Sequence, residues 1–343
     1  MHRAALARVR MCSPGTRRGL GLCLWLAAVG MARAQPAQLR EVHQNLLATC
    51  MVSDAQGWMA GELGRIFRTD DGGKTWTRQD AGTKRPLLAL ACVDANTAWV
   101  TSTQGALYHT TDGGKSWGKV DTTSDRHVFA LKFPTAQRGH GGGDFGRMIH
   151  TEDGGKTWTK SQVPTDIVLP ESALDTGVDP GDVNLYSLSY GTPELAWMVG
   201  EFGIAMHSTD GGLTWKQQKT PVETTLFGVY FNEAQNGWVV GGDATVLHTQ
   251  DGGVTWMPQH SPITGRPLFD VMVRGQTGWI VGESGAMLKS NDGGNTWQTQ
   301  ELPIQLAARW IRSVFLTDGA KGLAVGAEGL VFRLDAGTAE PFN

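Results

Sequence analysis

One six-residue motif, Asp-Gly-Gly-x-Thr/Ser-Trp, occurs six times in this chain of 343 residues. Its aspartates are Asp71, Asp112, Asp153, Asp210, Asp251 and Asp292, and its tryptophans are Trp76, Trp117, Trp158, Trp215, Trp256 and Trp297. Successive copies are separated by 41, 41, 57, 41 and 41 residues. A period near 40 residues indicates one supersecondary unit repeated along the chain, so this period constrains the fold more than any single motif does.

Each unit contains four short segments of strand character separated by turns. In the second unit, residues 87–93 form an apolar run that suits a strand buried on both faces, and residues 99–101, 107–110 and 117–120 supply three more strands. Four short antiparallel strands in about 40 residues are typical of a propeller blade. We therefore predict an all-β chain that forms a β-propeller of four-stranded antiparallel blades, each with a box turn.

A seventh unit is present without an intact box. Residues 326–333 match residues 61–68 of the first unit, but residues 334–338 lack the box tryptophan. We count seven blades and expect the last one to lack a good fourth strand of its own. Residues 38–42 are the candidate to supply that strand, because closure of the ring by the N-terminal segment would leave no exposed sheet edge.

The box has the composition of a tight structural turn. An aspartate carboxylate can accept hydrogen bonds from backbone N–H groups of its own turn, and glycine adopts positive φ without steric cost. The tryptophan ring can bury on the order of 150–250 Å² against the sheet. Since a catalytic site would not be repeated six times, we interpret the boxes as scaffold and expect function where the units differ.

The first 34 residues have the features of a signal peptide. Several arginines precede an apolar stretch over residues 19–31, and Ala32-Arg33-Ala34 is a suitable cleavage site before Gln35. Residues 16–20 include a twin arginine, with Leu20 in place of the usual phenylalanine, so the Sec and twin-arginine routes both stay open. We expect residues 35–343 to be exported as a single propeller.

Charge and ligand-forming residues exclude several classes of function. Removal of residues 1–34 removes six arginines and no acidic residue, so the formal net charge changes from −3 to −9. An acidic chain without a basic run is a poor partner for nucleic acid or an anionic membrane surface. The remaining histidines are scattered, and no Cys or His pair has the spacing of metal ligands. We predict no metal and no cofactor.

Two cysteines remain beyond residue 34. Cys50 lies eight residues before Trp58, and Cys92 lies seven residues before Trp99. Both positions fall on the first strands of neighbouring units, but with opposite parity, and strand side chains alternate between faces. The two thiols therefore either both face the cleft between blades 1 and 2, where a disulfide could form, or both point away from it.

The full repeat resembles a known family. Asp-boxes also occur in sialidases and sortilin-like receptors, but residues 133–139 and the run from Gly237 to Trp256 resemble the photosystem II assembly and stability factor family. The resemblance covers about residues 40–335. It implies a monomeric, non-enzymatic seven-bladed propeller that binds a membrane-protein intermediate on the exported side, in the periplasm or in a thylakoid lumen. It also implies that an arginine patch on one face takes part.

Arginines at the links between blades are our best match to that patch. Arg85, Arg126 and Arg309 lie 14 residues before the reference position of the second strand, Arg266 lies 13 before it, and Arg312 is close by. The planar guanidinium suits recognition of carboxylates and peptide backbone. The alternative is that these arginines pair with acidic residues of the facing turns, namely Glu62, Asp144, Glu201, Asp243, Glu283 and Glu328.

Two further departures from the repeat are possible sites. The spacing of 57 residues adds 16 residues within 161–184, and this acidic insertion with three prolines either contacts a partner or is a disordered surface loop. In the third unit, His140 replaces the second-strand tryptophan within a glycine run. That run resembles an esterase oxyanion-hole motif, but the chain has no Gly-x-Ser-x-Gly elbow, so we interpret it as a weakened strand.

A glycoside hydrolase of the sialidase-like Asp-box type is the main alternative function. Such an enzyme needs a tyrosine nucleophile with a glutamate, or a pair of carboxylates. The four tyrosines fall at strand positions that core packing explains: Tyr108, Tyr186, Tyr190 and Tyr230. A carboxylate pair among the acidic turn residues stays open, as does a carbohydrate- or protein-binding module. We predict that the chain is not an enzyme.

Overall fold

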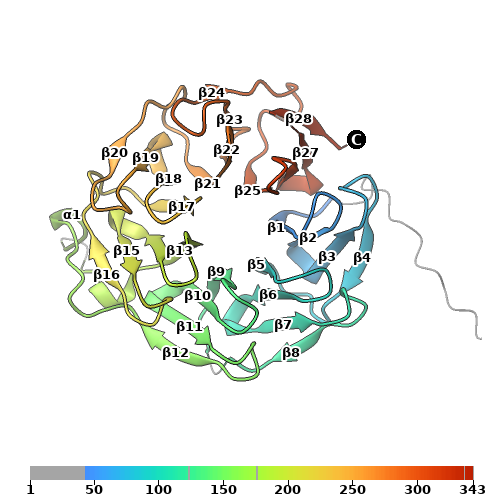
Figure 1. Cartoon of the computed structure of the whole chain (residues 1–343), viewed down its shortest axis with the longest axis horizontal. Coiled ribbons are helices and arrows are strands. Elements are labelled where there is room, and N and C mark those ends of the chain that lie inside the picture. Colours follow the sequence, from blue (N-terminus) through green and yellow to red (C-terminus); the bar gives the residue numbers. More distant parts are fainter. Residues whose placement is uncertain (1–42, 123, 175–176, 336, 343) are drawn as a thin grey trace, which may run out of the picture. The chain divides into compact units, whose positions relative to one another are not determined.

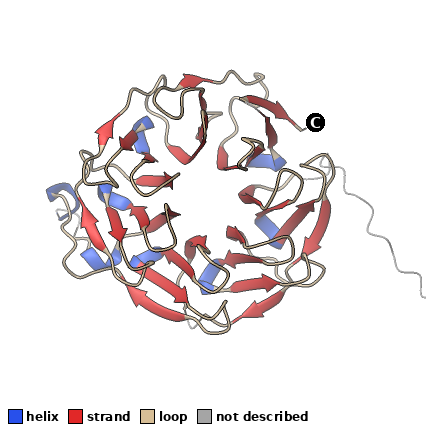
Figure 2. Cartoon of the chain, viewed as in Figure 1, coloured by secondary structure: helices blue, strands red, loops and turns tan. Residues whose placement is uncertain are grey.

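Seven four-stranded antiparallel sheets are arranged around a central axis in the computed structural model (Figure 1). The structure describes residues 43–122, 124–174, 177–335 and 337–342. Strands account for nearly all of its regular structure, with only short helical turns between them (Figure 2). The prediction of a seven-bladed propeller is confirmed. The proposed signal peptide, residues 1–34, lies outside the described residues.

Each blade is a meander in which sequence order equals spatial order from the axis outward. The inner strands are β1 (Leu46–Met51), β5 (Leu87–Cys92), β9 (Val128–Lys132), β13 (Leu185–Tyr190), β17 (Leu226–Phe231), β21 (Leu268–Arg274) and β25 (Ile311–Leu316). The second strands are β2 (Gly57–Gly61), β6 (Ala98–Ser102), β10 (Gly139–Gly143), β14 (Ala196–Gly200), β18 (Gly237–Gly241), β22 (Thr277–Gly282) and β26 (Gly322–Gly326).

The two outer positions of each blade follow in the same way. The third strands are β3 (Arg65–Thr69), β7 (Leu107–Thr110), β11 (Arg147–Thr151), β15 (Ala205–Ser208), β19 (Val246–Thr249), β23 (Met287–Ser290) and β27 (Val331–Asp335). The outer strands are β4 (Thr77–Asp80), β8 (Gly118–Val120), β12 (Thr159–Gln162), β16 (Lys216–Gln218), β20 (Met257–Pro258), β24 (Gln298–Thr299) and β28 (Thr338–Pro341).

The core lies between neighbouring blades, because each sheet is covered on both faces. The second strands are buried along almost their whole length, which explains their apolar and glycine-rich sequences. The second-strand tryptophans Trp58, Trp99, Trp197, Trp238 and Trp279 are at most 1% exposed. Trp197, for example, stacks on Phe231 of the next blade with ring centres 3.5 Å apart. Packing between blades, rather than within a sheet, therefore holds the ring together.

The box turns have the hydrogen bonds that their composition predicts. In the first box, Asp71 accepts hydrogen bonds from the backbone N–H of Thr75 at 2.8 Å and from its hydroxyl at 2.6 Å. Thr69 accepts a hydrogen bond from the N–H of Gly73 at 2.8 Å. The same bonds recur in the other five boxes, and hydrogen bonds from Thr296 lower the pKa of Asp292 to about 2. The boxes therefore act as structural turns.

The seventh blade corrects one expectation. Its fourth strand is β28, from the C-terminal segment, and not residues 38–42, which lie outside the described residues. Asp335 of β27 pairs with Thr338 of β28, and Gly337 has φ 88°, so this hairpin forms without a box tryptophan. Blade 1 instead joins blade 7 through the segment before β1, where Gln44 accepts a hydrogen bond from the N–H of Gly329 at 2.8 Å.

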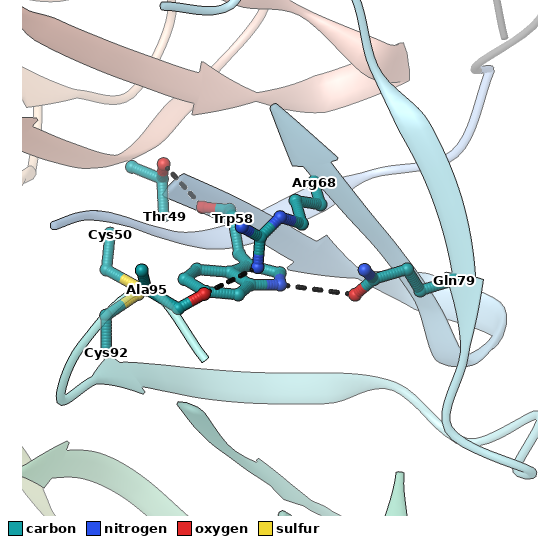
Figure 3. Close-up of a disulfide and its surroundings, with 7 residues drawn as sticks. All are labelled: Thr49, Cys50, Trp58, Arg68, Gln79, Cys92 and Ala95. Carbon is teal, nitrogen blue, oxygen red and sulfur yellow. Dashed lines mark hydrogen bonds between the residues drawn. A yellow bond between two sulfur atoms is a disulfide. The ribbon is translucent and has the colours of Figure 1, made fainter. Parts of the chain in front are cut away.

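A disulfide joins the first two blades. Cys50 of β1 and Cys92 of β5 are bonded, with their Cα atoms 6.1 Å apart. Figure 3 shows this bond beside Trp58, whose ring centre lies 4.6 Å from the guanidinium of Arg68. Arg68 in turn donates a hydrogen bond to the carbonyl of Ala95, in the second blade, at 2.7 Å. Of the two arrangements that the spacing allowed, both thiols face the cleft between blades 1 and 2.

The insertion between blades 3 and 4 packs onto the propeller. It contains α1 (Glu171–Leu174) and the short helix η5 (Pro180–Asp182). Its residues Val163, Ile167 and Leu169 are at most 5% exposed and join the core of blade 4. Its backbone at Val168 exchanges two hydrogen bonds with the side chain of Gln217 on β16. A disordered loop does not fit the described part of this segment.

Candidate partner-binding face

Each link between two blades crosses the hairpin that joins the second and third strands. The backbone carbonyl of Arg309, in the link to blade 7, accepts a hydrogen bond from the N–H of Gly285, in the hairpin of blade 6, at 2.7 Å. Arg266 and Ala244 make the same contact between blades 5 and 6 at 2.8 Å. The links and these hairpins therefore share one face, which we call the arginine rim, and the box turns lie at the opposite ends of the strands.

The link arginines also reach forward to the hairpin of the blade that follows. Arg309 forms an ion pair with Glu328 of blade 7 at 2.9 Å. Arg266 donates a hydrogen bond to the carbonyl of Ser284 of blade 6 at 3.1 Å. Each of these side chains thus spans the seam between two blades, on the surface of the rim.

The same arrangement recurs on the other side of the ring. Arg85 donates a hydrogen bond to the side chain of Gln104 in blade 2. The guanidinium of Arg126 lies 4.3 Å from the ring centre of Phe145 in blade 3. The four arginines therefore occupy an arc that runs over blades 6 and 7, past blade 1, to blades 2 and 3.

Most of this charge has no carboxylate partner among the described residues. Among the described residues, only Arg309 of the four has a carboxylate partner, and Arg85, Arg126 and Arg266 form no ion pair. Acidic pairing therefore accounts for one rim arginine in four. The other three retain N–H donors that can bind a carboxylate or a peptide carbonyl.

The fifth predicted arginine does not lie on the rim. Arg312 is the second residue of β25 and lines a cavity of about 260 Å³ within the ring of inner strands. The structure therefore separates it from the other four. The cavity and the residues beside Arg312 were not predicted from the sequence, although a signal exists, since one inner-strand position carries aromatic residues in four consecutive units.

The arginine rim also carries exposed apolar side chains. Leu63 and Phe145, at the tips of two hairpins, are 51% and 44% exposed. Ile304, in the link to blade 7, is 85% exposed, and Val168 of the insertion is 74% exposed. Arginine and exposed apolar or aromatic side chains together are the composition that protein interfaces favour.

In blade 3, which lacks the second-strand tryptophan, His140 is held by a tyrosine of the next blade. His140 is 3% exposed, and its Nδ1 lies 2.7 Å from the hydroxyl of Tyr190 in blade 4. That hydroxyl also donates a hydrogen bond to the carbonyl of Gly211, a box glycine, at 3.1 Å. In the next blade, the indole N–H of Trp197 donates to the equivalent carbonyl of Gly252 at 2.9 Å. His140 is therefore a structural residue.

No cluster of metal-ligating side chains occurs within the part of the chain that the structure describes. In the same residues, no helix is long and apolar enough to cross a membrane.

Comparison with known proteins identifies relatives of the whole propeller. The family model described as "Photosynthesis system II assembly factor YCF48" matches residues 32–126, 116–219, 213–309 and 262–335. The resemblance seen in the sequence is thereby confirmed. The search of curated proteins returned no significant match.

Solved structures with the same fold include members of that family and enzymes. The structure titled "YCF48 bound to D1 peptide" has a TM-score of 0.69 at 19% identity, over 88% of this chain and 96% of that one. YCF48 from Cyanidioschyzon merolae gives 0.68 at 18% identity, over 86% and 96%. The GH74 enzyme of Niastella koreensis gives 0.65 at 15% identity, over 87% of this chain but 53% of the enzyme. At these identities the likeness shows the fold alone.

Proposed function

Because the chain belongs to the family of the photosynthesis system II assembly factor YCF48, we propose that it is a non-catalytic assembly or docking factor. It captures a segment of a membrane-associated protein on the arginine rim. It acts as an exported monomer, in the periplasm or in the lumen of a thylakoid. Its proposed signal peptide, residues 1–34, directs it there by the Sec or the twin-arginine route.

The observation that carries this proposal is the set of unpaired rim arginines. Arg85, Arg126 and Arg266 lie at the seams between blades with no carboxylate partner among the described residues. Guanidinium groups without a carboxylate partner, gathered on one face of an otherwise acidic chain, are suited to bind an acidic ligand. Together with the exposed Leu63 and Phe145, they can bind both the charged and the apolar side chains of a protein segment.

A solved relative supports a protein partner. The structure titled "YCF48 bound to D1 peptide" holds a protein bound to a peptide. A peptide bound at the rim of this chain would span several hairpins, because the free arginines are distributed over different blades. Binding would then combine several modest contacts, which suits temporary capture of an assembly intermediate.

Charge reversal on the rim tests the proposal. We expect simultaneous Arg85→Glu, Arg126→Glu and Arg309→Glu substitutions to abolish capture of the partner in a crosslinking pull-down read by mass spectrometry. All three side chains lie on the surface, so circular dichroism and the melting temperature should change little.

A matched control reverses the same charge on the opposite face. Lys74, Lys115 and Lys156 are the exposed x residues of three boxes, and their change to Glu should leave capture intact. Equal loss in both triple variants would mean that net charge, not the rim, governs binding. Unchanged capture in the arginine variant would rule out this face.

A glycoside hydrolase remains the second candidate only because GH74 enzymes share the fold. Glycoside hydrolysis commonly uses two carboxyl groups on opposite sides of the scissile bond. Asp270 is the one acidic residue among the described residues that line the central cavity. Turnover of aryl glycosides by the purified protein, lost on Asp270→Asn or on substitution of a single acidic rim residue, would overturn the non-catalytic proposal.

A further inference from the structure

The inner strands carry a β-bulge at the same place in all seven blades. The pairing with the second strand shifts by one residue near the start of each inner strand, which leaves one residue unpaired in six blades and two, Leu88 and Ala89, in blade 2. One such residue from each blade forms a ring that lines the central cavity. Bulges often re-aim a side chain next to a functional site. The ring consists of Leu47, Leu88, Phe129, Tyr186, Phe227, Phe269 and Arg312.

This ring is asymmetric. Blades 3 to 6 carry aromatic residues, and neighbouring ring centres lie 5.6 Å apart from Phe129 to Tyr186, 5.3 Å from Tyr186 to Phe227 and 5.6 Å from Phe227 to Phe269. All four rings are half-buried, so part of each faces the cavity. Together they form a curved aromatic wall over four consecutive blades, which we call the aromatic wall.

A cation lies beside the last ring of the aromatic wall, Phe269 of blade 6. The guanidinium of Arg312 lies 5.1 Å from the ring centre of Phe269. Within the described residues, Arg312 forms no hydrogen bond and no ion pair. The same holds for Lys132, the last residue of β9, which is exposed and lines the same cavity. Both cations thus line the central cavity with unused donors, Arg312 near the start of its inner strand and Lys132 at the end of its own.

One carboxylate faces these cations, and its oxygens are already occupied. The third residue of the inner strand is Asp270 in blade 6, whereas the other six blades have Ala, Ser or Gly at this position. Asp270 accepts hydrogen bonds from the N–H groups of Val314 at 2.9 Å and Val271 at 3.0 Å, and from the hydroxyl of Ser313 at 3.2 Å. Burial raises the pKa of Asp270, although Lys132 and Arg312 oppose that change.

The charges in this space do not balance. Lys132 and Arg312 carry two positive charges against the single negative charge of Asp270. The surrounding inner strands desolvate both groups and lower the pKa of both cations, although solvent still reaches Lys132. A third cation, Arg274, lines the cavity too, but it forms an ion pair with Asp318 at 3.6 Å. A confined charge without a partner is costly, so one further anion would be stabilised here.

We propose that the central cavity binds an apolar carboxylate, with its carboxylate group on Arg312 and Lys132 and its apolar part against the aromatic wall. Guanidinium groups recognise carboxylates through paired hydrogen bonds. Aromatic rings supply a large contact area for an apolar or aromatic body. A cavity of about 260 Å³ lies below the range of about 300–1,000 Å³ of drug-sized sites, so the ligand is about the size of one amino-acid residue.

Calorimetry with a matched pair of probes tests the chemistry. N-acetyl-L-phenylalanine carries a carboxylate beside an aromatic ring, and N-acetyl-L-phenylalanine amide differs only in the loss of that charge. We expect the acid to bind the full-length exported chain at least about tenfold more tightly than the amide, because charge-assisted hydrogen bonds are lost. Equal affinity for both, or no binding of the acid, would overturn the proposal.

Substitutions then locate the site. Arg312→Met and Lys132→Met should each weaken binding of the acid by about tenfold or more, while Arg266→Met on the rim should leave it unchanged. Asp270→Asn should act in the opposite direction and tighten binding, because it removes the nearest negative charge. Each variant is checked by circular dichroism. Wild-type affinity in both Met variants, with the fold intact, would refute the site.

Two sources of the ligand can be separated with the same measurement. A hexapeptide that ends in phenylalanine is compared with its C-terminal amide. Binding of the free-acid peptide alone would identify a chain terminus as a ligand, whereas binding of N-acetyl-L-phenylalanine without the peptide would identify a small free carboxylate. Either outcome supports the carboxylate site. The proposal of this site does not depend on whether the arginine rim captures a partner.

Discussion

Replacement of Tyr190 by phenylalanine tests how the third and fourth blades are joined. A carbonyl can only accept, so the single proton of the Tyr190 hydroxyl goes to Gly211, at 3.1 Å. His140 must then donate from Nδ1 to the same hydroxyl, at 2.7 Å. This assignment leaves Nε2 of His140 without a proton, and that atom is buried without a partner in the structure.

The magnitude follows from the groups that lose their partners. Tyr190→Phe leaves Nδ1 of His140 and the carbonyl of Gly211 without a hydrogen bond, and both residues are buried. An unsatisfied buried group costs about 1–3 kcal/mol. Two such groups lead us to expect a fall of about 2 kcal/mol or more in the free energy of unfolding, with a decrease of several degrees in the melting temperature.

The chain contains its own control for the loss of a hydroxyl. Tyr230 lies on an inner strand as well, but its hydroxyl is buried without a partner. Tyr230→Phe should therefore be neutral or slightly stabilising, since it removes an unsatisfied polar group. Urea unfolding of both variants measures the difference. A loss below about 0.5 kcal/mol for Tyr190→Phe, which is the scale of ordinary surface changes, or equal losses for both variants, would refute the reasoning.

Two further predictions concern the same scaffold. Burial, with smaller effects from His150 and Arg138, lowers the pKa of His140 to about 4, so its neutral form stabilises the fold above about pH 6.5, and this stability is lost as the pH falls toward 4. His140→Asn should remove about 3 kcal/mol of the difference in unfolding free energy between pH 7 and pH 4, and an unchanged pH profile would contradict this. A double Cys50→Ala, Cys92→Ala variant should lose up to about 4 kcal/mol, because the disulfide closes a loop with a sequence separation of 42. If the variant had the urea midpoint of the wild type, and reductant did not change the midpoint of the wild type, the disulfide would add no stability.

The repeat made the fold readable from the sequence, because the elements that fix it are local. Each box supplies its own hydrogen bonds within five residues, as Asp71 and Thr75 illustrate, and each second strand is recognisable by its tryptophan. No such local signal marks the fourth strand of blade 7. An outer strand buries little and needs little sequence signal, so β28 forms with only a glycine turn before it.

The candidate sites were less accessible, because they depend on contacts between blades. The sequence placed Arg85, Arg126, Arg266 and Arg309 at equivalent positions, but it left their pairing open. Within the part of the chain that the structure describes, Arg309 alone among them pairs with a carboxylate. Arg312 differs from this group because it lies on the inner strand itself, at the bulged position that lines the cavity, and its spacing from the repeat alone did not separate it from the link arginines.

The box turns and the tips of the rim hairpins use positive φ in different ways, and this difference supports a functional role for the rim. Box turns place glycine at every such position, for example Gly72 and Gly73. At the tips of the rim hairpins, all seven blades have a residue with a side chain at φ between 49° and 58°: Leu63, Gln104, Phe145, Phe202, Asp243, Ser284 and Glu328. The left-handed conformation costs such residues about 1 kcal/mol or more each, and glycine or asparagine would avoid most of it. The chain therefore gives up stability at the tips of the rim, where side chains differ from blade to blade and several, such as Leu63 and Phe145, are exposed.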